Sequence, residues 1–179
     1  MKKICFLLLP VAVLLASVIS CSSAPQNSES ASANAAEKEK IDLMLRAGMA
    51  APSGKDLRPW EFYVITERAS LDSMAAALPY AKMLTEARYA IVVCGDSTRS
   101  SYWYLDCSAA AQNILLAAES LGLGAVWTAA YPYEDRMQVV RKYTNLPDNI
   151  LPLCVIPFGY PAVQQQPKQK YDEKKIHYQ

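Results

Sequence analysis

The chain has 179 residues, of which 52% are apolar, and this length and composition suit one domain with one hydrophobic core. The formal net charge is +1, so no polyanion-binding surface is expected and nucleic acid is excluded as a partner. The single histidine is His177, which leaves too few candidate ligands for a histidine-based zinc site and no Ser-His-Asp triad.

Residues 1–36 are expected to precede the folded domain. Residues 1–20 have the pattern of a signal peptide, with Lys2 and Lys3 ahead of an apolar run that is short for a membrane span of about 20 residues. The run ends in VISC, which resembles the lipobox of bacterial lipoproteins. This implies lipidation of Cys21 and a domain anchored to a bacterial membrane in the cell envelope, outside the cytoplasm. The alternative is an ordinary signal peptide with an incidental cysteine.

Residues 21–36 are rich in Ser, Ala and Asn, and we expect a flexible tether there. The domain then spans residues 37–179, in which helical and extended patterns alternate. The predicted helices are 37–49, 69–78, 105–121 and 133–143, with a proline-interrupted continuation over 81–87, and the predicted strands are 60–66, 89–94, 124–127 and 151–158. This alternation predicts an α+β fold, with a central mixed sheet and helices on both faces.

The predicted helix over 105–121 is the longest element of the domain. It is apolar on nearly every side and has two charged residues, Asp106 and Glu119, so we expect a buried helix and not an amphipathic one. Gly122 stands where a left-handed C-cap is expected. The domain's three cysteines, Cys94, Cys107 and Cys154, lie in apolar strand or helix contexts, which favours core residues over disulfides.

Without a glycine-rich phosphate loop or a nucleophile with a base, any catalytic activity is expected to come from a cofactor. Two segments resemble the nitroreductase family of FMN oxidoreductases: APSGKDLRPW at 51–60 and DCSAAAQNILLAAESLGLGAVW at 106–127. The segment LCVIPFGYP at 153–161 resembles the family's last strand. The resemblance covers residues 41–177, nearly the whole predicted domain.

The resemblance implies an enzyme that takes hydride from NADH or NADPH, or from another donor, and passes it through FMN to a small-molecule acceptor such as a nitroaromatic or a quinone. It also implies an intertwined homodimer built on the central helix, with flavin sites at the interface and a C-terminal arm that wraps the partner. The residues it places beside the flavin are Ser53, Asp56 and Arg58 at the ring and ribityl chain, the backbone of Tyr131 and Pro132 at the reactive nitrogen edge, and Lys168 and Lys170 at the phosphate.

Five aromatic residues flank this region, and they either line a substrate pocket or belong to the core and interface: Tyr102, Trp103, Tyr104, Tyr131 and Tyr133.

The chain also departs from the family pattern. The family's R-x-S-x-R motif is missing, because no arginine precedes Arg46. This removes two charge-assisted phosphate contacts worth about 1.5–3 kcal/mol each. Asp56 and Arg58 replace the usual Asn and Gln, and we expect Arg58 to pair with Asp56. The alternative function is therefore a degenerate, non-catalytic lipoprotein of this fold with weak or no flavin binding.

Overall fold

The computed structural model describes residues 26–163 and 165–179, with side chains from residue 37 onward. The predicted signal peptide and Cys21 lie outside these residues. Within them, no helix is both long and apolar enough to cross a membrane.

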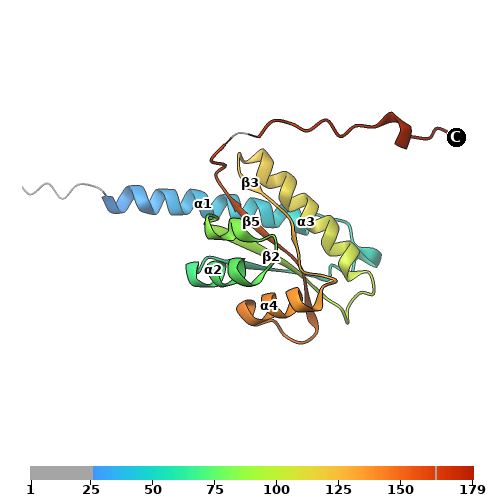
Figure 1. Ribbon diagram of the computed structural model, residues 1–179, viewed down its shortest axis with the longest axis horizontal. Helices are drawn as coiled ribbons and strands as arrows, with labels where there is room; N and C mark the ends of the chain where they lie inside the picture. The colour runs from blue at the N-terminus through green and yellow to red at the C-terminus, as the bar shows by residue number, and fades with distance from the viewer. Residues whose placement is uncertain (1–25, 164) are drawn as a thin grey trace, which may run out of the picture.

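A five-stranded sheet lies between two layers of helices (Figure 1). Its strands are β1 (Trp60–Ile65), β2 (Tyr89–Asp96), β3 (Gly124–Ala125), β4 (Thr128–Ala129) and β5 (Ile150–Gly159). The helices α1 (Gln26–Met49) and α3 (Trp103–Ser120) cover one face, and α2 (Arg68–Ala77) and α4 (Glu134–Thr144) cover the other. Short 3₁₀ turns occupy Gly54–Asp56, Lys82–Thr85 and Glu173–Lys175. The predicted α+β fold with helices on both faces is confirmed.

The sheet is antiparallel in every strand pairing of the described residues, so the expectation of a mixed sheet was wrong. The order is β1-β2-β5-β3, and β4 also pairs with β5. A single helix between two strands usually gives a parallel pair. Here residues 79–88 bring the chain back after α2, so Ala90 lies opposite Ile65 and β2 runs against β1.

The predicted strand over 124–127 forms two short strands instead of one. Val126 stands between them and reaches β5 through a single bond, from its backbone N–H to the carbonyl of Pro157 at 3.4 Å. Pro157 has no N–H to donate in return, so it interrupts the hydrogen-bond ladder of the strand. Gly122 has a φ of 73°, as expected of a left-handed C-cap.

Helix α1 begins at Gln26, before the predicted start at residue 37. The intervening segment contains Ala and Glu, which have high helix propensity and allow the helix to continue. Helix α3 is buried on the side that faces the sheet, but its outer side is exposed in the single chain. Leu105 is 54% and Leu116 is 60% exposed. The prediction that this helix is buried was therefore wrong for the single chain.

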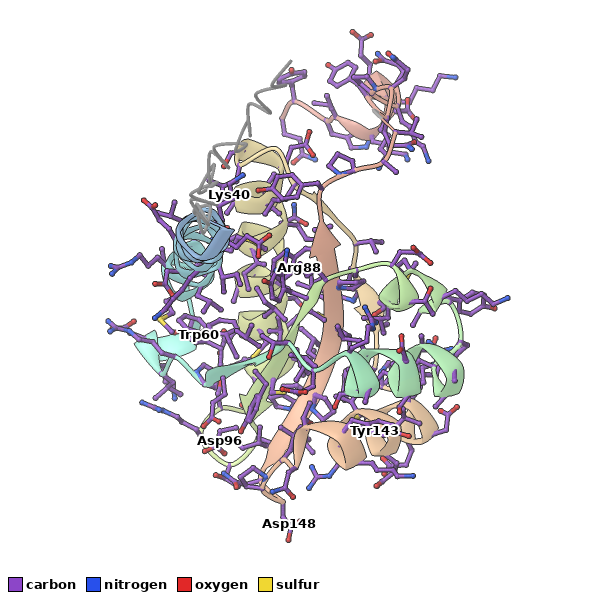
Figure 2. All side chains as sticks on the ribbon, turned by 90° about the vertical axis from the view of Figure 1, so that its left-hand side faces the viewer. Lys40, Trp60, Arg88, Asp96, Tyr143 and Asp148 are labelled. Atoms are coloured by element: carbon purple, nitrogen blue, oxygen red, sulfur yellow. The ribbon has the colours of Figure 1, made fainter. Side chains whose placement is uncertain are left out.

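The two ends of the sheet differ in what they carry. Lys40 lies near one end and Asp148 at the other (Figure 2). The first end holds the C-terminal end of β5 and the turn after α3. The second holds the loop after α1, the N-terminal end of α3 and the segment that follows β4. Along β5, Leu153 and Phe158 are separated by about 17 Å, at a rise of about 3.4 Å per residue.

Candidate functional site

The loop over residues 51–59 joins α1 to β1 and carries three of the predicted site residues. The hydroxyl of Ser53 accepts a hydrogen bond from the backbone N–H of Arg58 at 3.0 Å. Lys55, Asp56 and Arg58 have positive φ values of 56°, 54° and 49°. Such values are uncommon for residues other than glycine. The loop is therefore a specific, strained structure that presents its polar side chains to solvent.

Asp56 and Arg58 form the expected ion pair. Arg58 donates from Nε to Oδ1 of Asp56 at 2.7 Å and from Nη2 to Oδ2 at 2.5 Å. The hydrogen bond from Arg58 lowers the pKa of Asp56 below its ordinary value, and the same bond raises the pKa of Arg58. Both side chains are exposed, so solvent screens the pair and its main effect is on the shape and charge of the loop.

The loop is tied to the N-terminal end of α3 by Asp106, which the sequence analysis did not select. The carboxylate accepts from the backbone N–H of Gly54 at 2.8 Å and from the hydroxyl of Ser100 at 3.1 Å. Asp106 is only 6% exposed. A carboxylate in the first turn of an otherwise apolar helix was the available signal. This bond joins the two segments that resemble the nitroreductase family.

Aromatic rings cluster beside the N-terminal end of α3. Tyr104 and Tyr131 are stacked, with centroids 5.6 Å apart and an interplanar angle of 24°. Trp103 is buried and meets Tyr131 edge to face at 4.9 Å. Tyr102 and Tyr133 are exposed. Trp103 therefore belongs to the core, and Tyr131 is half-buried against it. A role of the tyrosines in a substrate pocket stays a prediction.

Tyr131 and Pro132 lie at the same end of the sheet as the 51–59 loop. The backbone N–H of Tyr131 donates to the carbonyl of Leu153 at 3.0 Å, and the Tyr131–Pro132 peptide is cis.

Lys168 and Lys170, by contrast, are exposed in a tail that leaves the body of the protein after β5 (Figure 1). One chain therefore brings together the loop and the Tyr131–Pro132 segment, but not the two lysines.

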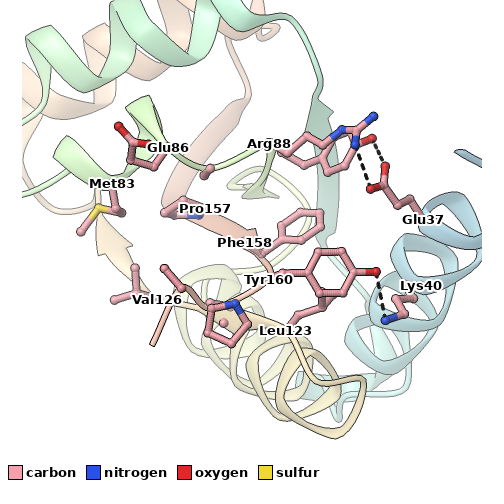
Figure 3. A pocket seen from close by; sticks show the side chains of 17 residues that line it. Glu37, Lys40, Met83, Glu86, Arg88, Leu123, Val126, Pro157, Phe158 and Tyr160 are labelled. Carbon is pink, nitrogen blue, oxygen red and sulfur yellow. Dashed lines mark hydrogen bonds and ion pairs between the residues drawn. The ribbon is translucent and has the colours of Figure 1, made fainter. Parts of the chain in front are cut away.

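A cavity of about 400 Å³ opens at the opposite end of the sheet (Figure 3). Its floor is apolar and includes Leu123, Val126 and Phe158. At the rim, Lys40 donates to the Tyr160 hydroxyl at 3.3 Å and to the Leu121 carbonyl at 3.1 Å. None of the predicted site residues lines this cavity. A sequence pattern could not reveal it, because its walls come from four separate segments.

The charges around the cavity are balanced. Two carboxylates, Glu37 and Glu86, line it together with two cations, Lys40 and Arg88. Glu37 accepts from Arg88 at 3.1 Å. The cavity is in the size range of small-molecule sites, but its rim alone gives little net attraction to a phosphate.

The loop and the cavity each carry groups of the kinds that bind FMN, but in one chain they lie at opposite ends of the sheet. The loop offers polar groups and the tyrosines offer flat aromatic faces, both of which suit a flavin ring. The phosphate needs cations beyond those at the cavity rim. Lys168 stands six residues after Ala162, which lines the cavity. Six extended residues span about 20 Å, so this lysine can reach the rim.

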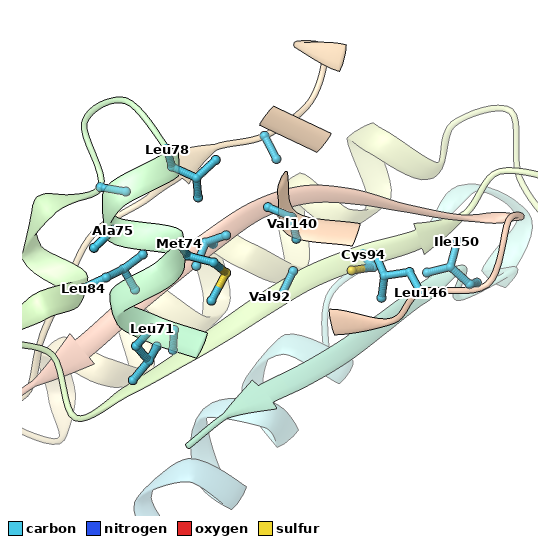
Figure 4. Packing of buried hydrophobic residues seen from close by; sticks show 14 residues of the cluster. Leu71, Met74, Ala75, Leu78, Leu84, Val92, Cys94, Val140, Leu146 and Ile150 are labelled. Carbon is cyan, nitrogen blue, oxygen red and sulfur yellow. The ribbon is translucent and has the colours of Figure 1, made fainter. Parts of the chain in front are cut away.

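The three cysteines of the domain are buried free thiols, as predicted from their apolar contexts. Cys94 belongs to the buried cluster between the sheet and the layer of α2 and α4, and it lies near Leu146 and Ile150 (Figure 4). Burial raises the pKa of Cys107 to about 12 and raises those of Cys94 and Cys154 as well. These thiols are therefore protonated at neutral pH and poorly nucleophilic. Among the described residues, no group of His, Cys, Asp and Glu side chains is placed to hold a metal ion.

Comparison with known proteins identifies the family. The family model described as the nitroreductase family matches residues 32–79 and 70–160. A crystal structure from Bacteroides thetaiotaomicron VPI-5482, named provisionally as an NADH dehydrogenase/NAD(P)H nitroreductase, has a TM-score of 0.78 and 86% identity, covering 79% of this chain and 84% of that one. A relative from Methanothermobacter thermautotrophicus with the same provisional name is 46% identical over 143 residues, which are 78% of this chain and 75% of the relative.

An FMN-dependent nitroreductase from Clostridium difficile R20291 is 31% identical, with a TM-score of 0.75, covering 79% of this chain and 87% of that one. These matches agree with the α+β fold and with the two sequence segments that meet at Gly54 and Asp106. The chain belongs to the nitroreductase family of oxidoreductases.

Proposed function

We propose that the protein is an FMN-dependent oxidoreductase that takes hydride from NADH, NADPH or another donor and reduces small electron-poor acceptors such as nitroaromatics or quinones. The observation that carries this proposal is the bond between Gly54 and Asp106, which places the polar 51–59 loop beside the tyrosine surface at one end of α3. Bound FMN would supply the hydride chemistry, and the protein's own side chains would bind and orient the reactants.

The active form is proposed to be a homodimer that uses the exposed side of α3. Leu105, Ala109, Gln112 and Leu116 follow one another at intervals of four, three and four residues, so they share one side of the helix. Two of the four are leucines that remain more than half exposed. A second copy related by a two-fold axis would cover the same side of both helices, because such an interface is self-complementary.

This symmetry offers a way to complete the site. If two α3 helices pack antiparallel, Leu105 of one chain lies against Leu116 of the partner subunit. The N-terminal end of one helix then stands beside the C-terminal end of the other. Consequently the 51–59 loop of one chain would approach the cavity near Leu123 of the other. The loop and the cavity lie at opposite ends of the sheet in one chain, and they would then meet across the interface.

Each group then has a distinct role. The hydroxyl of Ser53 and the backbone carbonyls of Tyr131 and Pro132 would hydrogen-bond and orient the flavin ring. The Asp56–Arg58 pair would lie beside the flavin ring and ribityl chain, at the edge of the site where the acceptor enters. The exposed tyrosines would stack with a flat acceptor and exclude water. Lys168 and Lys170 would neutralise the flavin phosphate, in place of the missing arginines.

A spectroscopic experiment tests the proposal. The purified protein is titrated with FMN while the flavin fluorescence is followed, and NADH or NADPH is then added with a nitroaromatic or a quinone in the absence of oxygen. We expect saturable binding and acceptor-dependent oxidation of the nicotinamide. Absence of saturable FMN binding rejects the enzyme proposal.

One observation favours a second candidate, a non-catalytic lipoprotein that keeps the fold. The cavity rim has no excess of positive charge, and both tail lysines are exposed in the single chain. With the N-terminal arginines also absent, flavin affinity depends on two lysines. The titration separates the candidates, since the degenerate protein would form the dimer without binding FMN.

We also propose that Cys21 carries a lipid and that the domain lies outside the cytoplasm. The support is the VISC sequence that follows the apolar N-terminal run. Because reduced nicotinamides are cytoplasmic, this location would require another electron donor or the reverse reaction direction. Labelling cells with a radioactive fatty acid tests the anchor: the label should enter the wild-type protein and be lost in Cys21→Ser. Equal labelling of both proteins would contradict it.

A further inference from the structure

The 51–59 loop has a backbone conformation that needs support from elsewhere in the protein. Lys55, Asp56 and Arg58 all have positive φ, and none of them is glycine. Residues in such conformations persist only where surrounding contacts hold them. The same loop carries three of the residues proposed to face the flavin, so what supports it also affects the site.

The loop's internal hydrogen bonds determine its shape but not its position. Asp56 N–H donates to the Ser53 carbonyl at 3.0 Å, and Leu57 N–H donates to the Gly54 carbonyl at 3.1 Å. Both bonds join residues of the loop to each other. At its far end, the Pro59 carbonyl accepts from Asp96 N–H at 2.8 Å, which anchors the entry into β1. The tip of the loop is attached to α3 through Gly54 and Asp106.

Asp106 is well suited to hold this tip. Its carboxylate is buried, and its second oxygen accepts from Ser100, which is only 3% exposed. The Ser100 hydroxyl also accepts from the backbone N–H of Tyr102 at 3.1 Å. The carboxylate is thus oriented from one side while it binds Gly54 on the other. A hydrogen bond from an N–H to a carboxylate is stronger than one between neutral groups.

We propose that Asp106 is a positioning residue of the flavin site. Its carboxylate holds the Gly54 amide and thereby sets where Ser53, Asp56 and Arg58 stand relative to the flavin. Asp106 acts through Gly54 and does not touch the flavin itself. The inference rests on the proposed FMN-dependent function and goes beyond it by assigning the placement of the loop to one buried side chain.

The test compares Asp106→Asn and Asp106→Ala with a control, Thr128→Val. The control removes another buried side-chain bond, from Thr128 to the Val155 carbonyl at 2.6 Å, in the sheet and away from the loop. Two quantities are measured on the full chain: hydrogen exchange of the Gly54 amide without FMN, and the FMN dissociation constant. The thermal midpoint is recorded for each variant, so that loss of stability is separated from loss of placement.

We expect Asp106→Asn to weaken FMN binding by about tenfold and to speed Gly54 exchange by a similar factor, since a charged acceptor becomes a neutral one. Asp106→Ala should have a larger effect on both quantities. Thr128→Val should lower the thermal midpoint without changing either quantity. If Asp106→Ala fails to fold, Ser100→Ala replaces it, with a smaller effect in the same direction.

Three results would overturn the inference. Unchanged Gly54 exchange in Asp106→Asn would show that the bond does not hold the loop. Faster exchange with unchanged FMN affinity would show that the loop's placement does not matter to the flavin. Absence of FMN binding by the wild-type protein would reject the proposed function and this inference together. The first two results would reject only the role of Asp106 and leave the proposed function standing.

Discussion

The exposed side of α3 leads to a prediction about assembly. Leu116 is 60% exposed in the single chain, and complete burial of a leucine side chain stabilises by about 1.5–3 kcal/mol. Covering the exposed part in a dimer therefore contributes about 1–2 kcal/mol per chain, or about 2–4 kcal/mol for the symmetric pair. Leu116→Glu removes this contribution and places two like charges at the interface, so the dimerisation constant should fall by at least about thirtyfold.

Sedimentation velocity over a range of protein concentrations measures this change. Ala76→Glu is the matched control, because it adds the same charge to an exposed position on α2, on the other face of the sheet. We expect Ala76→Glu to associate like the wild-type protein. The thermal midpoint of the wild-type protein should rise with concentration, as in dimers whose folding and association are coupled. A wild-type protein that sediments as a monomer with full helix content, or a Leu116→Glu variant with an unchanged dimerisation constant, would refute the reasoning.

Three further predictions concern the phosphate, the thiols and the core. Lys168→Ala should weaken FMN binding by roughly tenfold or more in a fluorescence titration, and the loss should shrink at high salt, whereas Lys174→Ala in the same tail should change it little. Cys107, with a pKa raised to about 12, should not react with iodoacetamide at pH 8 in the folded protein but should react once the protein is unfolded in urea. Gly95→Ala should lower the free energy of unfolding, measured by urea denaturation, by about 1–3 kcal/mol, because the new methyl group would lie 2.7 Å from the Trp103 ring. An unchanged urea midpoint would show that the ring can move.

Much of the fold follows from local patterns. The β-branched and aromatic run after Pro59 predicts β1, and the periodic apolar residues of α2 and α4 predict those helices within one or two residues. The positive φ of Gly122 also follows from its place after a helix. The strand directions do not, because they depend on where the 79–88 segment returns the chain, and no short-range pattern encodes that path.

Part of the candidate site also follows from local sequence patterns, and the rest depends on the tertiary structure. The pairing of Asp56 with Arg58 could be predicted because the residues are two apart in one loop and opposite in charge. The bond from Gly54 to Asp106 joins residues far apart in the sequence, so it required the packed structure. The same holds for the cavity, whose lining comes from α1, the residues around η2 and β2, β3 and the end of β5.

The sequence by itself determined the family, the one-domain size, the α+β class and the residues most expected to meet a flavin, because these depend on residue types and their spacing along the chain. Tertiary structure decided how those residues are distributed in space. It made the sheet antiparallel, left one side of α3 uncovered, and placed the 51–59 loop and the cavity at opposite ends of the sheet. The physical reason is that burial and strand pairing act between segments distant in sequence, and their outcome depends on the packing of the whole domain.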